Sequence, residues 1–146
     1  MTTTTKAKAS AAATSKLLAA SASGLERLSV ALQAISAEIP GRTSTRQSMA
    51  FVTCAYLNSM GRSVTLSELR ELIGDDNHGS PILGLSVERT MNAFLEPTKR
   101  DPEALGWLRQ VPDEDDRRKK YLELTPEGEA AVIRFIEAYE GRKMEA

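Results

Sequence analysis

Hydrophobic side chains recur at helical spacing along most of this chain. Between residues 25 and 39 the apolar positions are three and four residues apart, which is the spacing of a heptad seam, and Pro40-Gly41 ends it. Similar patterns follow residues 44, 65, 80 and 125, and each begins at a serine or threonine that can cap a helix. The pattern also places a capping box at Ser23. It therefore predicts a mainly α-helical chain.

Two short segments alternate apolar and polar residues instead. They span residues 107–111 and 120–124, and the charged stretch 112–119 between them indicates a β-hairpin with a solvated tip. Upstream, a short helix at 65–73, a turn at 74–79 and an amphipathic helix at 81–95 match a helix-turn-helix. The predicted fold class is therefore mainly α with a small β-hairpin, a winged helix-turn-helix with flanking dimerisation helices.

This reading divides the chain into four parts. Residues 1–22 are a flexible tail rich in Thr, Ala and Ser, and residues 23–42 are an N-terminal dimerisation helix. Residues 43–125 are the winged helix-turn-helix, with its wing at 107–124, and residues 126–146 hold a C-terminal dimerisation helix. The seam residues are Leu25, Leu28, Leu32, Ile35, Ile39, Val132, Phe135 and Tyr139. Whether the first seam packs within its own chain or against a second copy stays open.

The helix after residue 44 carries the single cysteine. We expect its buried face to comprise Met49, Val52, Tyr56, Leu57 and Met60, with Cys54 as a small core residue. A redox role for Cys54 would require an accessible thiol in an electropositive setting, which a sequence does not reveal. The stretch Asp75–His78 has adjacent polar residues without metal-ligand spacing, so we expect a plain turn and no metal site.

Composition narrows the function classes. The 146 residues carry 19 Lys+Arg and 20 Asp+Glu, a formal charge of −1 that excludes a uniformly basic coat but not a local basic docking face. One cysteine excludes an internal disulfide, and no apolar run approaches the ~18 residues that span a bilayer. We expect a cytoplasmic protein with no membrane partner and no cofactor. Nothing pairs a nucleophile with a base or cradles a phosphate, so an enzyme is not expected.

The charged hairpin has a recognisable pattern. The run from Asp115 to Gly128 contains an Asp-x-Arg turn, an alternating strand and then Leu-Thr-x-x-Gly entering a helix, and it resembles the wing of the MarR family of transcriptional regulators. Residues 64–69 resemble the opening of that family's helix-turn-helix, and the likeness covers roughly residues 44–128. It implies a homodimeric repressor that binds double-stranded DNA at a palindromic operator. Asp116 would hold the hairpin, and Arg118 would reach into a narrow minor groove.

The helix predicted from Pro81 would read the major groove. Arg89 is the foremost base-reading candidate, because a guanidinium can grip guanine with two hydrogen bonds. The other candidates are expected to reach bases, phosphates or the minor groove. They are Ser80, Ile82, Leu85, Ser86 and Asn92 in or before this helix, Arg62, Ser67 and Arg70 upstream, and Arg117, Lys119, Arg118 and Asp116 in the wing.

The chain also departs from the family's pattern. The loop at 74–79 is long, so the recognition helix starts either at Pro81 or nearer Ser86, and residues 98–105 are an insertion before the wing. Only one helix fits after the wing, where the family commonly has two, so nothing supports carrying over its small-molecule effector pocket. Two other functions stay open: a winged-helix adaptor for protein partners, and an accessory DNA-binding protein of plasmid or phage replication or partition.

Overall fold

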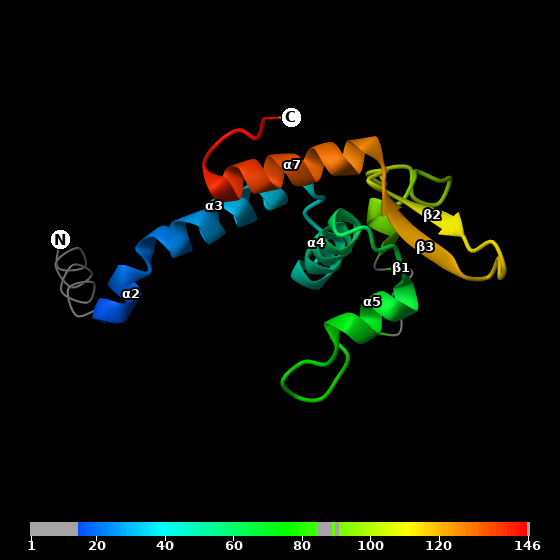
Figure 1. Ribbon diagram of the computed structural model, residues 1–146, viewed down its shortest axis with the longest axis horizontal. Helices are drawn as coiled ribbons and strands as arrows, with labels where there is room; N and C mark the ends of the chain where they lie inside the picture. Colours follow the sequence, from blue (N-terminus) through cyan, green and yellow to red (C-terminus); the bar gives the residue numbers. More distant parts are fainter. Residues whose placement is uncertain (1–14, 85–88, 90, 146) are drawn as a thin grey trace.

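The computed structural model describes residues 15–84, 89 and 91–145, and within them the fold is mainly helical with a small antiparallel sheet. The longer elements are α3 (Ala22–Glu38), α4 (Thr45–Ser59), α5 (Leu66–Ile73) and α7 (Pro126–Glu140). Shorter ones are α2 (Lys16–Ala20), a 3-10 turn η1 (Asn92–Phe94), and strands β1 (Val64–Thr65), β2 (Leu108–Pro112) and β3 (Lys120–Leu124). Figure 1 shows α3 and α7 side by side as one layer, and α4, α5 and the sheet lie on one side of this layer.

Three of the predicted helix starts are confirmed by their caps. Ser44 and Gln47 form a complete capping box, in which the Gln47 N–H donates to Ser44 Oγ and the Ser44 N–H donates to Gln47 Oε1. The Thr65 hydroxyl accepts from the Glu68 N–H, and the Thr125 hydroxyl accepts from the Gly128 N–H. Each cap satisfies an N–H that the first helical turn leaves without a partner.

The N-terminal boundary was predicted wrongly. Residues 16–20 form helix α2 instead of belonging to a flexible tail, and Ser23 lies inside α3, which begins at Ala22. The cap that starts the first helix is Ser15, whose Oγ accepts from the Leu18 N–H. The alanines that suggested a tail of low complexity are also the strongest helix formers, so local propensity outweighed composition. The rest of the predicted tail, residues 1–14, lies outside the described residues.

The sheet has one more strand than the hairpin pattern predicts. Its order is β1-β3-β2, with Val64 opposite Leu122 in one pair and Leu108 opposite Leu124 in the other. Strand β1 has only two residues, which is too short to show alternation in a sequence. Where β1 no longer pairs with β3, the side-chain amide of Asn58 from α4 forms hydrogen bonds to the edge of β3. Its amide donates to the Leu122 carbonyl at 3.3 Å and accepts the Leu124 N–H at 2.8 Å.

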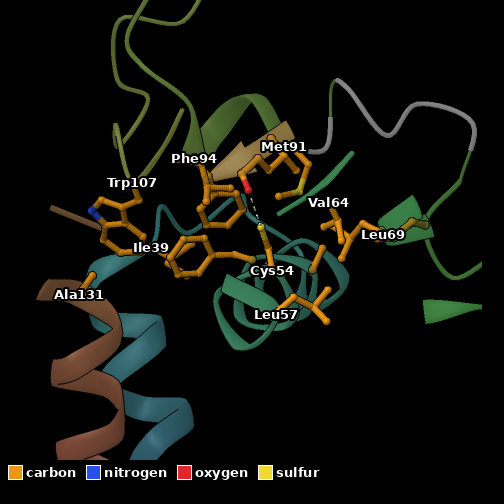
Figure 2. Packing of buried hydrophobic residues seen from close by; sticks show 14 of the residues in the cluster. Ile39, Cys54, Leu57, Val64, Leu69, Met91, Phe94, Trp107 and Ala131 are labelled. Carbon is orange, nitrogen blue, oxygen red and sulfur yellow. Dashed lines mark hydrogen bonds between the residues drawn. The ribbon is translucent and has the colours of Figure 1, made fainter. Parts of the chain in front are cut away.

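The core is centred on aromatic rings. The rings of Phe51 and Phe94 stack with their centroids 4.9 Å apart, and Trp107 tilts against both. The fourth ring, Phe135, meets Trp107 edge-on with centroids 5.8 Å apart. Figure 2 shows Phe94, Trp107 and Ile39 on one side of α4, the helix that carries Cys54. These contacts join α4, η1, the start of β2 and α7.

The buried face of α4 differs from the prediction. Ala50, Phe51, Cys54 and Leu57 are buried, whereas Val52, Met60 and Tyr56, the last 60% exposed, face solvent. The reason is the Phe51–Phe94 stack, which fixes the rotation of the helix about its axis. Leu57 and Cys54 as core residues are confirmed. Burial raises the pKa of the Cys54 thiol to about 12, so this thiol stays protonated at neutral pH and does not fit a redox sensor.

Gly128 marks a close approach between α7 and the backbone that leads into β2. A Cβ added at this position would overlap the carbonyl oxygen of Trp107, which accepts the Thr125 N–H at 3.0 Å. The Thr125 hydroxyl donates to the neighbouring Gly106 carbonyl at 2.6 Å. The Leu-Thr-x-x-Gly pattern therefore has a local physical role: it lets the first turn of α7 rest directly on the backbone before β2.

The close contact at Gly128 predicts a loss of stability in Gly128→Ala. Replacing a helical glycine by alanine normally stabilises a helix by up to about 1 kcal/mol, but here the overlap with backbone should reverse the sign and cost about 1–3 kcal/mol. Gly24→Ala in α3 is the matched control, because a Cβ there meets no atom within 4 Å and should be neutral or stabilising. Urea unfolding of both variants measures the difference, and equal effects would contradict the packing described.

Candidate nucleic-acid interface

The hairpin tip between β2 and β3 is organised by Asp113. Its Oδ1 accepts the N–H groups of Asp115 at 2.8 Å and Asp116 at 3.3 Å, and its Oδ2 accepts the Tyr121 hydroxyl at 2.8 Å. The backbone closes the turn, because the Asp113 N–H donates to the Lys119 carbonyl and the Lys119 N–H donates to the Asp116 carbonyl. One carboxylate thus fixes both the turn and the strand that follows it.

The bonds to Asp113 are reflected in its acidity. The Asp115 N–H and, next, the Tyr121 hydroxyl hold the pKa of the Asp113 carboxyl below its ordinary value, because both bond to the ionised form. The same hydrogen bond raises the pKa of Tyr121. Asp113 was not among the predicted site residues. The signal available in the sequence was an aspartate after a proline at the start of a turn.

Asp116 and Arg118 form a pair within the tip. Asp116 Oδ1 accepts the Arg118 N–H at 3.1 Å and lies 3.4 Å from Arg118 Nε. The Arg118 side chain is nevertheless 94% exposed, so the aspartate orients the guanidinium without covering it. The predicted holding role of Asp116 is therefore shared: Asp116 positions the arginine, while Asp113 shapes the turn.

The wing and the start of α5 enclose a hollow of about 440 Å³. Arg118, Lys119 and Lys120 of the hairpin contribute to its lining. The N-terminal end of α5 contributes to the lining too, and the N–H groups and helix dipole at that end add partial positive charge. The remaining lining residues are Thr65, Leu66, Ser67, Asn92, Leu95 and Gln110. Because cations and a helix N-terminus line the same hollow, it is electrostatically suited to an anionic ligand.

The hollow brings together four of the predicted DNA-binding residues. Ser67 from α5, Asn92 from η1, and Arg118 and Lys119 from the wing all line it, although they are up to about 50 positions apart in the sequence. The other described candidates do not line it. Arg117 is exposed at the tip and Arg89 is an exposed helical residue, Arg62 is exposed in the turn after α4, and Arg70 is half-buried on α5. Leu85 and Ser86 lie outside the described residues.

The recognition helix does not begin at Pro81. Pro81 forms an isolated β-bridge with Asp75, and the Ile82 N–H donates to the Gly74 carbonyl at 3.0 Å, so residues 80–84 are not helical. Arg89 and Met91 are helical, and the start nearer Ser86 falls outside the described residues. Ile82 is half-buried, which leaves it less available to DNA than predicted.

Hydrogen bonds from two side chains explain this difference. Asp76 Oδ1 accepts the N–H groups of His78 and Ser80, which lowers the pKa of Asp76 and builds the expected turn. Arg46 of α4 donates to the Ile82 carbonyl at 3.1 Å and lies 3.6 Å from Asp76 Oδ2. The segment 74–82 is therefore held against the start of α4. Among the residues that the structure describes, no group of His, Cys, Asp and Glu could hold a metal ion.

The predicted dimerisation residues separate into two sets. Leu25, Leu28, Leu32 and Tyr139 are exposed, and Ile35 and Val132 are half-buried. Ile39 and Phe135 were predicted wrongly, because both are buried in the core of their own chain and cannot meet a partner.

The seam of the first long helix, α3, packs in part against its own chain. The C-terminal half of α3 packs against α7 of the same chain, where Arg134 donates two hydrogen bonds to Glu38 at 2.9 and 2.6 Å. Those bonds lower the pKa of Glu38.

Comparisons of this chain with protein families, curated proteins and solved structures gave no match. Within its described part, no helix is long and apolar enough to cross a membrane.

The hydrogen bonds that Asp113 accepts predict a specific pH response of the hairpin tip. Because its pKa is lower in the folded hairpin than in an unfolded chain, its bonds stabilise the tip above the ordinary carboxyl value of 3.8. They are lost as the pH falls through the lower folded value, so the protection of the Asp115 and Asp116 amides against exchange, taken relative to the rate of an unfolded chain at the same pH, should then fall. In Tyr121→Phe the pKa of Asp113, followed by carboxyl ¹³C NMR, should move back toward 3.8.

Asp76 provides the internal control for this titration. Its pKa is lowered mainly by the backbone N–H groups of Ser80 and His78, neither of which contacts Tyr121. Tyr121→Phe should leave it unchanged. A shift of both carboxyls, or of neither, would mean that the tyrosine hydroxyl does not hold the tip through Asp113.

Proposed function

We propose that this protein is a homodimeric regulator of transcription that binds double-stranded DNA through a winged helix-turn-helix, as a repressor. The observation that carries the proposal is the gathering of Ser67, Asn92, Arg118 and Lys119 around one hollow, from three separate segments of the chain. Arg118, Lys119 and Lys120 make this a local basic surface on a chain whose formal charge is −1. Local charge on the docking face, not net charge, is what phosphate recognition needs.

The arrangement of the elements supports the same proposal. The order α4, β1, α5, helical residues at 89 and 91, and then β2 and β3 is compatible with a winged helix, and β1 ties the start of α5 to the wing. The N-terminus of α5 would face a phosphate, and the helix that carries Arg89 would enter the major groove. The exposed Arg118 would reach into the adjoining minor groove, held in place by Asp116.

An adaptor that binds a protein partner is the contrasting function, and salt separates it from DNA binding. Binding to duplex DNA releases counterions, so its affinity should fall by orders of magnitude between about 50 and 200 mM salt. Selection from a random duplex pool at two salt concentrations should enrich a palindrome. Retention of no duplex at low salt would overturn the proposal.

The exposed wing arginine predicts a general loss of affinity in Arg118→Ala. The variant should bind every duplex more weakly, with a salt slope lower by about one, because one cation leaves the interface. Arg142→Ala is the matched control, because it removes the same charge from an exposed residue just after α7. The C-terminal end of α7 lies away from the wing, which adjoins the N-terminal end of this helix (Figure 1). Fluorescence anisotropy titrations measure both. Equal losses in the two variants would indicate a nonspecific charge effect and not a wing contact.

A base-reading role of Arg89 predicts a different pattern of affinity loss. If it reads a base edge, Arg89→Ala should relax the preference at one operator position by about 1–3 kcal/mol and leave the other positions unchanged. Affinities for a set of single-base operator variants measure this. A uniform weakening across the set would make Arg89 a phosphate contact.

A further inference from the structure

One side-chain amide joins helix α4 to the strand that leaves the hairpin tip. Asn58 is half-buried near the C-terminal end of α4. Its Nδ2 donates to the Leu122 carbonyl at 3.3 Å, and its Oδ1 accepts the Leu124 N–H at 2.8 Å, both in β3. Cys54 Sγ, one helical turn earlier, donates to the same Leu122 carbonyl at 4.0 Å (dashed line in Figure 2). The amide thus offers β3 the donor and the acceptor that a neighbouring strand would supply.

The same amide also holds the turn that follows α4. Asn58 Nδ2 donates to the Arg62 carbonyl at 3.0 Å. Turning the amide over would put Oδ1 against two carbonyl oxygens, so the three bonds fix its orientation. A second link lies beside it, where Ser63 Oγ donates to Glu123 Oε2 at 3.0 Å, but that bond is exposed. The bonds from Asn58 to β3 are partly shielded from water, which makes them the stronger connection.

Helix α4 holds the segment after Arg89 as well. Phe51 of α4 stacks on Phe94, which follows Arg89 by five positions, and Met91 between them in sequence is fully buried. Phe51 and Asn58 are seven residues apart, which is about two turns, or roughly 10 Å, of one helix. A helix over that length is a rigid element. One helix therefore holds both the chain next to the proposed base-reading arginine and the strand of the wing.

We infer that Asn58 is a positioning residue for DNA binding: it sets the distance and angle between the wing and the Arg89 segment at which Arg118 reaches the minor groove. This inference rests on the proposed function and adds a residue that does not line the basic hollow. Among the described residues, the ion pair of Arg118 is with Asp116 of the same tip. The place of Arg118 relative to Arg89 therefore depends on how β3 is held.

Asn58→Leu removes this connection without changing charge. Leucine is close in shape to asparagine but has no donor or acceptor, so the three backbone groups lose their partner and β3 should shift from the end of α4. The bonds of Asp113 and the pair of Asp116 with Arg118 lie within the tip and should persist. Residual dipolar couplings of backbone amides should therefore show an intact tip in a new orientation relative to α4. Native couplings in this variant would overturn the inference without any use of DNA.

A double-mutant cycle tests whether Asn58 acts through the wing. Fluorescence anisotropy measures binding to one labelled duplex of mixed sequence, about 30 base pairs long, at about 50 mM salt. In the native background Arg118→Ala should weaken binding about ten-fold. In the Asn58→Leu background the same change should cost about two-fold or less, because the arginine no longer reaches its contact.

Ser44→Ala is the matched background, because it removes a helix cap from the other end of α4 and destabilises the fold without touching β3. There Arg118→Ala should again cost about ten-fold. Circular dichroism melting checks that each chain folds, and Asn58→Ala, which leaves room for water at β3, replaces a leucine variant that does not.

A loss of about ten-fold in all three backgrounds would overturn the positioning role and leave DNA binding intact. If the native chain does not retain the duplex at this salt concentration, the proposed function and the inference fall together.

Discussion

Trp107 is the residue on which the arrangement of the described fold depends. Its ring contacts Phe51, Phe94 and Phe135, which come from α4, η1 and α7. Its backbone N–H donates to the Phe94 carbonyl, and its own carbonyl accepts the Thr125 N–H beneath Gly128. One residue thus fixes where β2 begins, where β3 ends and where α7 crosses them. A change in any of these contacts would shift the hairpin relative to the helices.

The geometry of the candidate interface depends on that arrangement. Strand β3 is held on one side by β2 and on the other by β1 and the amide of Asn58, so its backbone is held close to the start of α5. A solvated turn has little packing to order it. At the tip, Asp113 orders the turn instead, by accepting hydrogen bonds from the backbone and from the Tyr121 hydroxyl. The basic side chains are exposed, but the backbone that carries them is fixed at both ends. Such preorganisation reduces the ordering cost of binding.

Local signals allowed much of the fold to be predicted. Caps at Ser44, Thr65 and Thr125 located three helices, and alternation located the hairpin to within one residue. The errors concern information that is not local. The rotation of α4 depends on the Phe51–Phe94 stack, and the form of segment 74–82 depends on Arg46, about 30 positions earlier. In the candidate site, the wing cations were visible as a run of charge. Their proximity to Ser67 and Asn92 required the tertiary fold.

The hairpin tip combines opposite charges in order along the chain. Residues 113–116 are four acids and residues 117–120 are four bases, so the tip carries a strong charge separation but no net charge. Its electric field therefore falls off quickly with distance, and the chain as a whole adds only one negative charge. For a polyanionic target, attraction would act mainly after contact. Salt should then shorten the lifetime of a complex much more than it slows the encounter, which is the reverse of electrostatically steered association.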